Sequence, residues 1–259
     1  MERGDERQGH GAGQGRCCDP ADRSRRGCLG TSAPGALAMS PEALSAQRLY
    51  GDIRDAIMTG AFRPGEVLVT SHIAERFGTS VSPVRDVLHQ LLGEGLIQAQ
   101  SIGGFYVPAL APRGIGHLYR WQAELTYLVA RSAPGLETIS DPLDPGLSHG
   151  RKAGVLTPVE IAHGCSRLFH ALAGISDNPE HHLAFARLDA RLHLVRCHEA
   201  VLGRCQGELV SLWGHLRSGN RHRARTALWH YHRRRLLNLE RIFAALVAAG
   251  HARASAHEI

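Results

Sequence analysis

The residues from Thr79 to Arg85 are the part of the chain whose side chains best suit the binding of an anion. Thr79, Ser80 and Ser82 carry short hydroxyl groups, and Arg85 carries a guanidinium. A guanidinium can donate two parallel hydrogen bonds to a phosphate or to the O6 and N7 edge of guanine, whereas hydroxyl groups suit single bonds to phosphate oxygens. This cluster therefore predicts contacts with phosphate groups or base edges.

Histidine and cysteine are the other residues that could bind a metal or take part in catalysis, and the chain has 17 histidines and 6 cysteines. The histidines form no His-Glu-x-x-His motif, which a zinc hydrolase of that type needs. No two cysteines have the spacing of a zinc knuckle or a redox pair, so free thiols in a reducing cytoplasm are expected. The cysteines are Cys17, Cys18, Cys28, Cys165, Cys197 and Cys205.

The anion-binding cluster needs a rigid support, and the sequence before it is patterned for two short helices. Apolar residues from Leu49 recur at helical spacing, and Gly60 can end that helix in a left-handed turn. After a Pro-Gly turn a second helix is expected to begin near Leu68, with Thr70 or Ser71 as its N-cap.

A third helix would carry Arg85 on its polar side. Ser82 is the predicted N-cap and Pro83 the first helical residue, where the missing N–H costs nothing. Gly95 ends this helix. Its inward stripe is predicted to be Val84, Val87, Leu88, Leu91 and Leu92.

Two short strands are predicted next, Leu96-Ile97 and Phe105-Tyr106-Val107, on either side of a glycine turn. Three helices followed by a two-stranded hairpin are the order of a winged helix-turn-helix, whose third helix lays its N-terminal residues in the major groove of DNA. The positive end of that helix also favours phosphate. The candidate DNA-binding residues are Ser71, His72, Thr79, Ser80, Ser82, Arg85, Gly103 and Gly104.

The same stretch resembles the DNA-binding domain of the GntR family of bacterial transcriptional regulators. One position departs from the family pattern, because Val81 stands where members usually have an arginine two residues before the proline. A base or phosphate contact is expected to be lost or replaced there. The residues that carry the resemblance are Ile57, Gly60, Pro64, Gly65, Leu68, Ala74, Gly78, Ser80, Pro83, Val84, Arg85, Leu88, Leu91, Gly95, Leu96, Ile97 and Gly104 to Val107.

Length and composition further limit the class of protein to which the chain can belong. At 259 residues the chain is long enough for two domains, and a formal charge of +6 suits a polyanionic partner. No apolar run reaches the roughly 18 residues that a membrane helix needs, so no membrane association is expected. The expected divisions are a disordered leader over 1–40, a winged helix-turn-helix domain over 41–110, a helical domain over 111–250 and a tail over 251–259.

The second half has helical periodicity throughout. Pro and Gly break the chain from Pro134 to Pro158, and one long last helix is expected from Ala224 through Leu246. The fold class is therefore mainly α, with an N-terminal winged helix-turn-helix and a C-terminal all-α antiparallel bundle of about five or six helices. The first bundle helix, over His117 to Ser132, is predicted to bury Leu118, Trp121, Leu125, Leu128 and Val129.

This half is similar to the ligand-binding domain of the FadR-type branch of the GntR family, the FCD domain. Many members of that branch hold a divalent metal through one Asp and three His, and the metal holds a small organic-acid effector. The similarity rests on Phe169-His170, Leu172, Ser176-x-Asn178-Pro179, Leu188, Leu192, Arg196, Glu208, the turn at Leu216 to Gly219, Ala224, Ala227 and Leu228.

The resemblance implies that most of this metal site is missing here. Ser166, Leu209 and Tyr231 stand where three of the four ligands are expected, and only His170 remains. Zinc needs three or four converging ligands, so no metal or other cofactor is expected. Gln122 falls near an arginine that often contacts the effector. The candidate effector-binding residues are therefore Gln122, Ser166, His170 and Tyr231.

Two interpretations of the remaining polar residues stay open. A shifted zinc site could use His170 with His230 or His232 and with Cys165 or His193. The basic cluster Arg233-Arg234-Arg235 is expected on a solvated face, with a phosphate contact or a dimer contact as the alternative.

These residues together predict a dimeric, sequence-specific transcriptional regulator that is not an enzyme. By analogy with the family it would be a repressor, controlled by a small organic acid-like effector. Two winged domains related by a two-fold axis would bind an inverted-repeat operator in double-stranded DNA. The alternatives are a metal-dependent enzyme built on the histidine-rich bundle and a helical adaptor that does not bind DNA.

Overall fold

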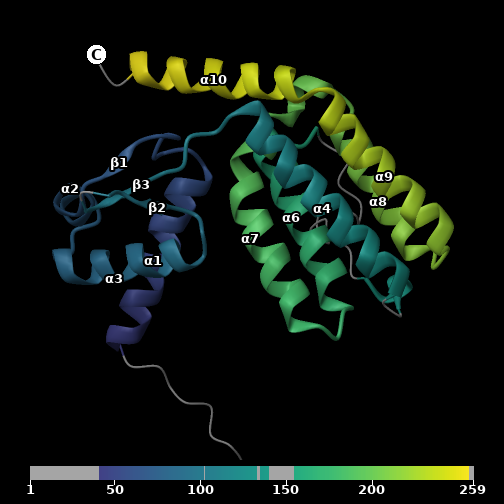
Figure 1. The fold of residues 1–259 in the computed structure, drawn as a ribbon, viewed down its shortest axis with the longest axis horizontal. Coiled ribbons are helices and arrows are strands. Elements are labelled where there is room, and N and C mark those ends of the chain that lie inside the picture. The colour runs from purple at the N-terminus through teal and green to yellow at the C-terminus, as the bar shows by residue number, and fades with distance from the viewer. Residues whose placement is uncertain (1–40, 102, 133–134, 140–154, 257–259) are drawn as a thin grey trace, which may run out of the picture. The chain divides into compact units, whose positions relative to one another are not determined.

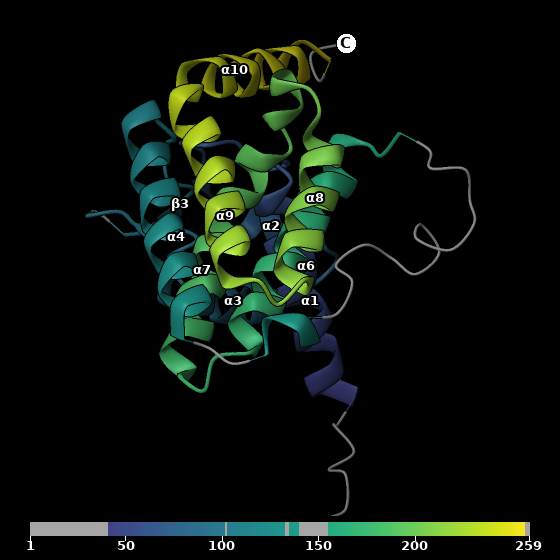
Figure 2. The ribbon, with the colours of Figure 1, turned by 90° about the vertical axis from the view of Figure 1, so that its right-hand side faces the viewer.

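The computed structural model describes residues 41–101, 103–132, 135–139 and 155–256. The leader predicted over 1–40 lies outside these residues, and so does most of the loop predicted from Pro134 to Pro158. Figures 1 and 2 show a mainly helical chain, in which a winged helix-turn-helix is followed by a helical bundle. The predicted fold class is confirmed.

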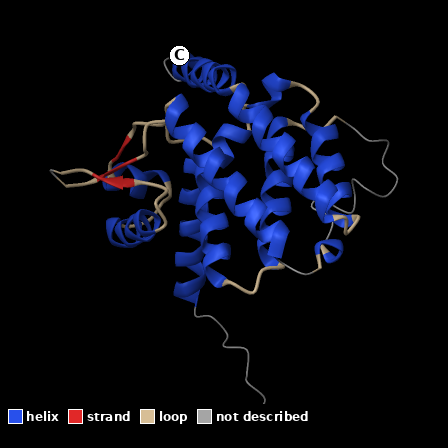
Figure 3. Cartoon of the chain, turned by 45° about the vertical axis from the view of Figure 1, so that its right-hand side comes forward, coloured by secondary structure: helices blue, strands red, loops and turns tan. Residues whose placement is uncertain are grey.

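The N-terminal part combines three helices with a small antiparallel sheet (Figure 3). Its strand order is β1-β3-β2, so the sheet has three strands where the sequence predicts a hairpin of two. The extra strand, β1, pairs with the edge of β3 whose N–H and C=O groups would otherwise have no partner. The elements are α1 (Pro41–Met58), β1 (Val67–Leu68), α2 (Thr70–Arg76), α3 (Val81–Gly93), β2 (Gln98–Ala99) and β3 (Phe105–Tyr106).

Two of these helices begin at other residues than predicted. α2 begins at Thr70 with Val69 as its N-cap, and α3 begins at Val81 with Ser80 as its N-cap. Pro83 is therefore the third residue of α3 and not the first. This position suits proline as well, because none of the first four N–H groups of a helix has a partner within the helix.

A hydrophobic core holds α3 in place. Leu96 and Ile97, predicted as a strand, belong to this core but precede β2. On the outer side, the Tyr50 hydroxyl donates a hydrogen bond of 2.7 Å to Glu94 and links α1 to the end of α3. The predicted inward stripe of α3 is confirmed, because Val84, Val87, Leu88 and Leu91 are buried. The fifth residue of the stripe, Leu92, is only partly buried.

The C-terminal part is a bundle of helices. In Figures 1 and 2, α4, α6, α7, α8 and α9 run side by side, and α10 lies across one end. Thr157 begins α6 with a capping box, in which its side chain and that of Glu160 satisfy each other's backbone N–H groups. The helices are α4 (Pro112–Ser132), α6 (Pro158–Gly174), α7 (Pro179–Arg196), α8 (Cys205–Arg217), α9 (Arg221–Leu237) and α10 (Leu239–Ala256), with 3₁₀ turns η1 (Leu136–Thr138) and η2 (Glu199–Leu202).

The last long helix of the prediction is two helices. Asn238 ends α9 with a non-helical backbone, and its side-chain amide donates 2.8 Å to the carbonyl of Arg234. Its own carbonyl then accepts from the N–H of Ile242 in α10. An asparagine side chain competes with the helix for backbone hydrogen bonds, which explains the break. α10 runs to Ala256, so the tail predicted from residue 251 begins inside a helix.

The buried face of α4 differs from the predicted one. Trp121 and Leu128 are exposed, whereas Leu118, Leu125 and Val129 are buried as expected. α4 packs against α6, α7 and α9 together, so its buried face is broad and takes in polar residues that a search for apolar periodicity passes over. The additional buried residues are Ile115, Gly116, Tyr119, Gln122, Thr126 and Ala130.

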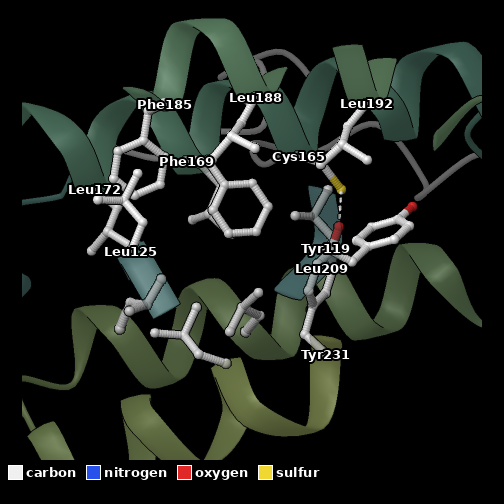
Figure 4. Close-up of a cluster of buried hydrophobic side chains, with 14 of the residues drawn as sticks. Tyr119, Leu125, Cys165, Phe169, Leu172, Phe185, Leu188, Leu192, Leu209 and Tyr231 are labelled. Carbon is white, nitrogen blue, oxygen red and sulfur yellow. Dashed lines mark hydrogen bonds between the residues drawn. The ribbon is translucent and has the colours of Figure 1, made fainter. Parts of the chain in front are cut away.

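Large apolar and aromatic side chains pack in the bundle interior (Figure 4). Phe169 lies at the middle of this interior, with Phe185 and Leu172 on one side and Cys165 and Tyr231 on the other. The Tyr231 hydroxyl donates to the Cys165 sulfur over 3.6 Å. Among the described helices, none is both long enough and apolar enough to cross a membrane.

Candidate functional site

The amino end of α3 presents polar groups on a surface that the core holds rigidly. Ser80, Ser82 and Arg85 are exposed, while Val84 and Val87 next to them are buried. Within the described residues Arg85 forms no ion pair, and no side chain caps the first turn of α3. The first-turn N–H groups and the guanidinium are therefore both available to an external acceptor.

The other predicted contacts lie around this end of α3. Ser71 and His72 are exposed in the first turn of α2, and Thr79, in the turn between the helices, is half buried. The Thr79 N–H donates 2.9 Å to the Ala74 carbonyl, which closes that turn. Val81, at the position where the family usually has arginine, is exposed and supplies no hydrogen-bonding side chain.

The hairpin between β2 and β3 has its two predicted glycines at the tip. Gly103 and Gly104 both have positive φ, +92° and +96°, a region that residues with a side chain rarely adopt. The Gln100 N–H donates 3.0 Å to the Gly104 carbonyl, and the Gly103 N–H donates 3.1 Å to the Gln100 carbonyl. Gly103 and Gly104 add no side chains to this tight turn, so their backbone is open to close approach by a partner.

Sequence reasoning missed three polar side chains near the hairpin. His89 of α3 packs edge-on against Phe105 of β3, with ring centroids 5.0 Å apart, and so couples the helix to the sheet. The Tyr106 hydroxyl donates 2.5 Å to the Gln98 side chain on the neighbouring strand. Their signal in the sequence is their position, since Gln98 and Tyr106 flank the glycine turn and His89 follows Arg85 by one helical turn.

The four predicted effector residues do not form a single group. Gln122 and Tyr231 are fully buried in the bundle. Ser166 and His170 lie instead on the side of α6 that faces α7, where the His170 ring is 3.4 Å from the Asp189 carboxylate and the Ser166 hydroxyl is 3.4 Å from the His193 ring. The His170 side chain remains about half exposed.

The alternative zinc site would need His170 close to His230 or His232. Among the described residues no three His, Cys, Asp or Glu side chains are grouped so that they could hold a metal ion. His230 is exposed, and His232 next to it is buried with its Nδ1 bonded to the Leu228 carbonyl at 2.8 Å. His170 instead contacts Asp189 of α7.

Buried ion pairs are the feature that sequence reasoning missed most completely. The cluster Arg233-Arg234-Arg235 is not a solvated face, because Arg235 is buried and donates to Glu199 at 2.8 and 2.9 Å. Arg234 donates 3.0 Å to Glu208, and only Arg233 is exposed. The prediction was wrong for Arg235 because its partner Glu199 lies 36 residues away in the sequence, where no local pattern indicates it.

A second buried pair links Arg196 to Asp189 on α7. Burial raises the pKa of Asp189, but the Arg196 charge and hydrogen bonds from His170 and Ser166 outweigh it, so this pKa lies well below its usual range. The pKa of Arg196 is raised, because the Asp189 charge outweighs burial. The two shifts agree, and the pair is charged at neutral pH.

Two histidines in the bundle are uncharged at neutral pH. Burial, with the nearby His163, lowers the pKa of His193 to about 4. Burial lowers the pKa of His232 to about 3, against a smaller opposing effect of its bond to the Leu228 carbonyl. Both therefore act as neutral hydrogen-bonding groups and not as cations.

Comparison with known proteins identifies the winged part of the chain. Residues 45–107 match the family model described as bacterial regulatory proteins, gntR family. The chain is 30% identical over 81 residues to the uncharacterized HTH-type transcriptional regulator YdhC of Bacillus subtilis (strain 168). It is 29% identical over 100 residues to the HTH-type transcriptional regulator McbR of Escherichia coli (strain K12). These relatives are named as transcriptional regulators, not as enzymes.

The match to these relatives is partial. It takes in 31% of this chain and 36% of YdhC, and 39% of this chain and 45% of McbR. The chain thus spans less than half the length of the curated relatives that it matches.

Solved structures resemble the fold over a greater length. A putative GntR transcriptional regulator from Rhodococcus sp. RHA1 has a TM-score of 0.62 at 20% identity, covering 78% of this chain and 99% of the other. E. coli McbR/YncC has a TM-score of 0.54 at 18% identity, covering 76% and 98%. At these identities the likeness establishes the fold alone. The match to the family model shows that residues 45–107 form a helix-turn-helix domain of the GntR family.

Proposed function

We propose that this protein is a sequence-specific DNA-binding transcriptional regulator. The observation that carries the proposal is the amino end of α3, exposed and uncapped, with Arg85 projecting from a helix that a buried stripe holds rigidly. The family match over the same residues supports it.

In this proposal α3 enters the major groove with its first turn leading. Arg85 donates to the guanine edge or to a phosphate, and Ser80, Ser82 and the backbone of the first turn bind phosphates and set the register. Ser71, His72 and Thr79 add phosphate contacts from α2 and from the turn. The tip at Gly103 and Gly104 approaches the minor groove or the sugar edge.

We further propose that the protein works as a homodimer in the cytoplasm and represses transcription. Two winged domains on a two-fold axis match an inverted-repeat operator. The dimer would have two arrangements that differ in their affinity for DNA. A small molecule that binds the helical bundle more tightly in one arrangement would shift the dimer toward it and so change the DNA affinity. The bundle is proposed as a regulatory domain and not as an enzyme.

Replacing Arg85 by alanine is expected to weaken specific DNA binding by about 1–3 kcal/mol, because one bidentate contact is lost. Bound genomic fragments would first be recovered by sequencing. The affinity for one such fragment and for a shuffled duplex would then be measured by fluorescence anisotropy at fixed salt. The specific fragment should lose affinity more than the shuffled one.

Arg217→Ala is the matched control, since it removes an equal charge from an exposed arginine at the end of α8. It is expected to leave the preference for the specific fragment unchanged. If Arg85→Ala and Arg217→Ala behave alike, α3 is not the reading helix. Absence of salt-dependent binding of the wild-type protein to any duplex would count against the function itself.

A further inference from the structure

Large apolar side chains lie on the outer sides of α4 and α9. Trp121 and Leu128 belong to the apolar stripe of α4 that the sequence predicts to be buried, yet both are exposed in the single chain. Tyr127 on α4 and Trp229 on α9 are exposed as well, and all four side chains are at least 39% exposed. Single exposed apolar residues are ordinary, whereas a group of them marks an interaction surface. This group indicates that another molecule covers the outer sides of the two helices.

A groove separates α4 from α9 on this side of the bundle. The two helices run side by side in Figures 1 and 2, and the groove between them has a volume of about 520 Å³. Glu124 and Tyr127 line it from α4, and Trp229 and Arg233 line it from α9. The helices have 21 and 17 residues, so at 1.5 Å per residue this face is about 25–30 Å long. That length suits packing against a second pair of helices.

Arginines hold both aromatic side chains of the groove in place. The Arg225 guanidinium lies 4.4 Å from the centroid of the Tyr127 ring and also donates a hydrogen bond to the Tyr127 hydroxyl. The Arg233 guanidinium lies 5.1 Å from the centroid of the Trp229 ring. Side chains that are already ordered lose little conformational entropy on association. Trp, Tyr and Arg are also the residue types that contribute most to the binding energy of protein interfaces.

The walls of the groove carry charges of both signs. Arg120 and Glu124 lie one turn apart on α4, and Arg233 lies on α9. Within the part of the chain that the structure describes, none of these three side chains takes part in an ion pair. A polyanion would meet Glu124, and a cationic partner would meet both arginines, whereas a surface of the same mixed composition can match both signs. Charge complementarity therefore favours a second copy of this chain as the partner.

A two-fold axis through the groove matches these charges. Such an axis exchanges the two walls of the groove, so that a residue of one wall meets the opposite wall of the other copy. With the axis midway between Glu124 and Arg233, Glu124 of each copy lies over Arg233 of the other. One dimer then contains two equal ion pairs, and the aromatic side chains of both copies are buried between them.

We propose that two copies of this chain associate through the outer sides of α4 and α9, with Tyr127 and Trp229 at the centre of the interface and two Glu124–Arg233 ion pairs beside them. The inference deepens the homodimer of the proposed function and rests on it, but it does not depend on DNA binding. It also gives a role to Arg233, the exposed member of the arginine cluster on α9.

Charge reversal in the full chain tests the two ion pairs. Glu124→Arg and Arg233→Glu each replace both ion pairs of the dimer by like-charge contacts, so each should raise the dimer dissociation constant at least about a hundredfold. Sedimentation velocity over a range of protein concentrations measures this constant, and circular dichroism checks that each variant is folded. Arg217→Glu is the control, because Arg217 packs on Trp213 as Arg233 does on Trp229 but does not line the groove. It should leave the dissociation constant unchanged.

A mixture of the two variants separates contacts between chains from contacts within one chain. A dimer of one Glu124→Arg chain with one Arg233→Glu chain has opposite charges at both contacts, so an equimolar mixture should recover the dimer that each variant alone has lost. Mixing changes no charge within either chain. Recovery in the mixture is therefore expected only if the two positions meet across the interface.

The aromatic centre of the interface is tested by Trp229→Ala. Removal of this side chain should raise the dimer dissociation constant at least about tenfold, because a large apolar contact is lost in each copy. Leu183→Ala is the control, since Leu183 is an equally exposed apolar residue on α7 and lies outside the groove. It should leave the constant unchanged.

The remaining outcomes also decide the question. A wild-type chain that stays monomeric at all concentrations would overturn this interface together with the proposed homodimer, while DNA binding is judged separately by the Arg85 experiment. A wild-type dimer that neither charge reversal weakens would overturn the interface and leave the homodimer in place. Dissociation of both variants without recovery in their mixture would overturn the two-fold pairing of Glu124 with Arg233.

Discussion

Replacing Glu199 by methionine is expected to destabilise the folded protein by about 3–5 kcal/mol. The two Arg235 bonds to Glu199 are made with both side chains only 1% exposed, and Glu199 also accepts the buried Tyr119 hydroxyl. Methionine fills a similar volume but leaves the Arg235 charge without its main partner in a region of low dielectric constant. Urea unfolding followed by far-UV circular dichroism measures the loss.

The double variant Glu199→Met with Arg235→Met tests the cause. It removes the unpaired charge and is expected to recover most of the stability, leaving chiefly the Tyr119 hydroxyl without an acceptor. Glu208 keeps its bond to Arg234 in that background. Equal instability of the single and double variants would mean that packing, and not the buried charge, is what Glu199 supplies.

Acidification from pH 6.5 to pH 4 is expected to destabilise the folded protein steeply. The pKa of His193 is lowered to about 4 and that of His232 to about 3, mainly by burial. Both bind protons in the unfolded chain at about pH 6.5 but not in the folded one, so the unfolded state binds more protons in this window. The free energy of unfolding is therefore largest above pH 6.5. As the pH is lowered it decreases by up to about 2.7 kcal/mol per pH unit, which is about 1.4 kcal/mol for each of the two protons.

Unfolding by urea at half-unit steps of pH measures this slope. His232→Gln and His193→Gln should each halve it, whereas His230→Gln, an exposed neighbour, should leave it unchanged. The Asp189–Arg196 pair adds to the slope only near pH 4, where Asp189 begins to bind a proton in the unfolded chain while its lowered pKa keeps it charged in the folded one. A flat profile between pH 6.5 and 4 would mean that water reaches both rings in the folded protein.

The winged domain was predictable because its signals are local. Gly60, Gly78 and Gly95 adopt positive φ where the helices end, and the stripe from Val84 to Leu91 is buried as its spacing indicates. The exact helix starts were less predictable, since several hydroxyl residues near Ser82 suit an N-cap equally well. β1 was missed because two residues carry no periodicity, and only the free edge of β3 makes them a strand.

The helices of the bundle were predictable, but which side of each helix is buried was not. Trp121 and Leu128 fit the apolar stripe of α4 and yet are exposed, while Gln122 and Thr126 are buried. Hydropathy orders residues by type, whereas the face that is buried depends on where α6, α7 and α9 lie around α4. For the same reason, two of the candidate effector residues, Gln122 and Tyr231, are buried in the bundle, whereas Ser166 and His170 contact α7.

The sequence by itself determined the helical fold, the family of the winged domain and the exposed position of Arg85 on α3, because each rests on contacts between residues close in the chain. Only the tertiary structure decided that Arg235 pairs with Glu199 and that Arg196 and His232 each pack near the Phe169 ring. A charged side chain has no preferred depth of its own. Partners brought from distant helices set the cost of burying it, and such partners leave no periodic trace in the sequence.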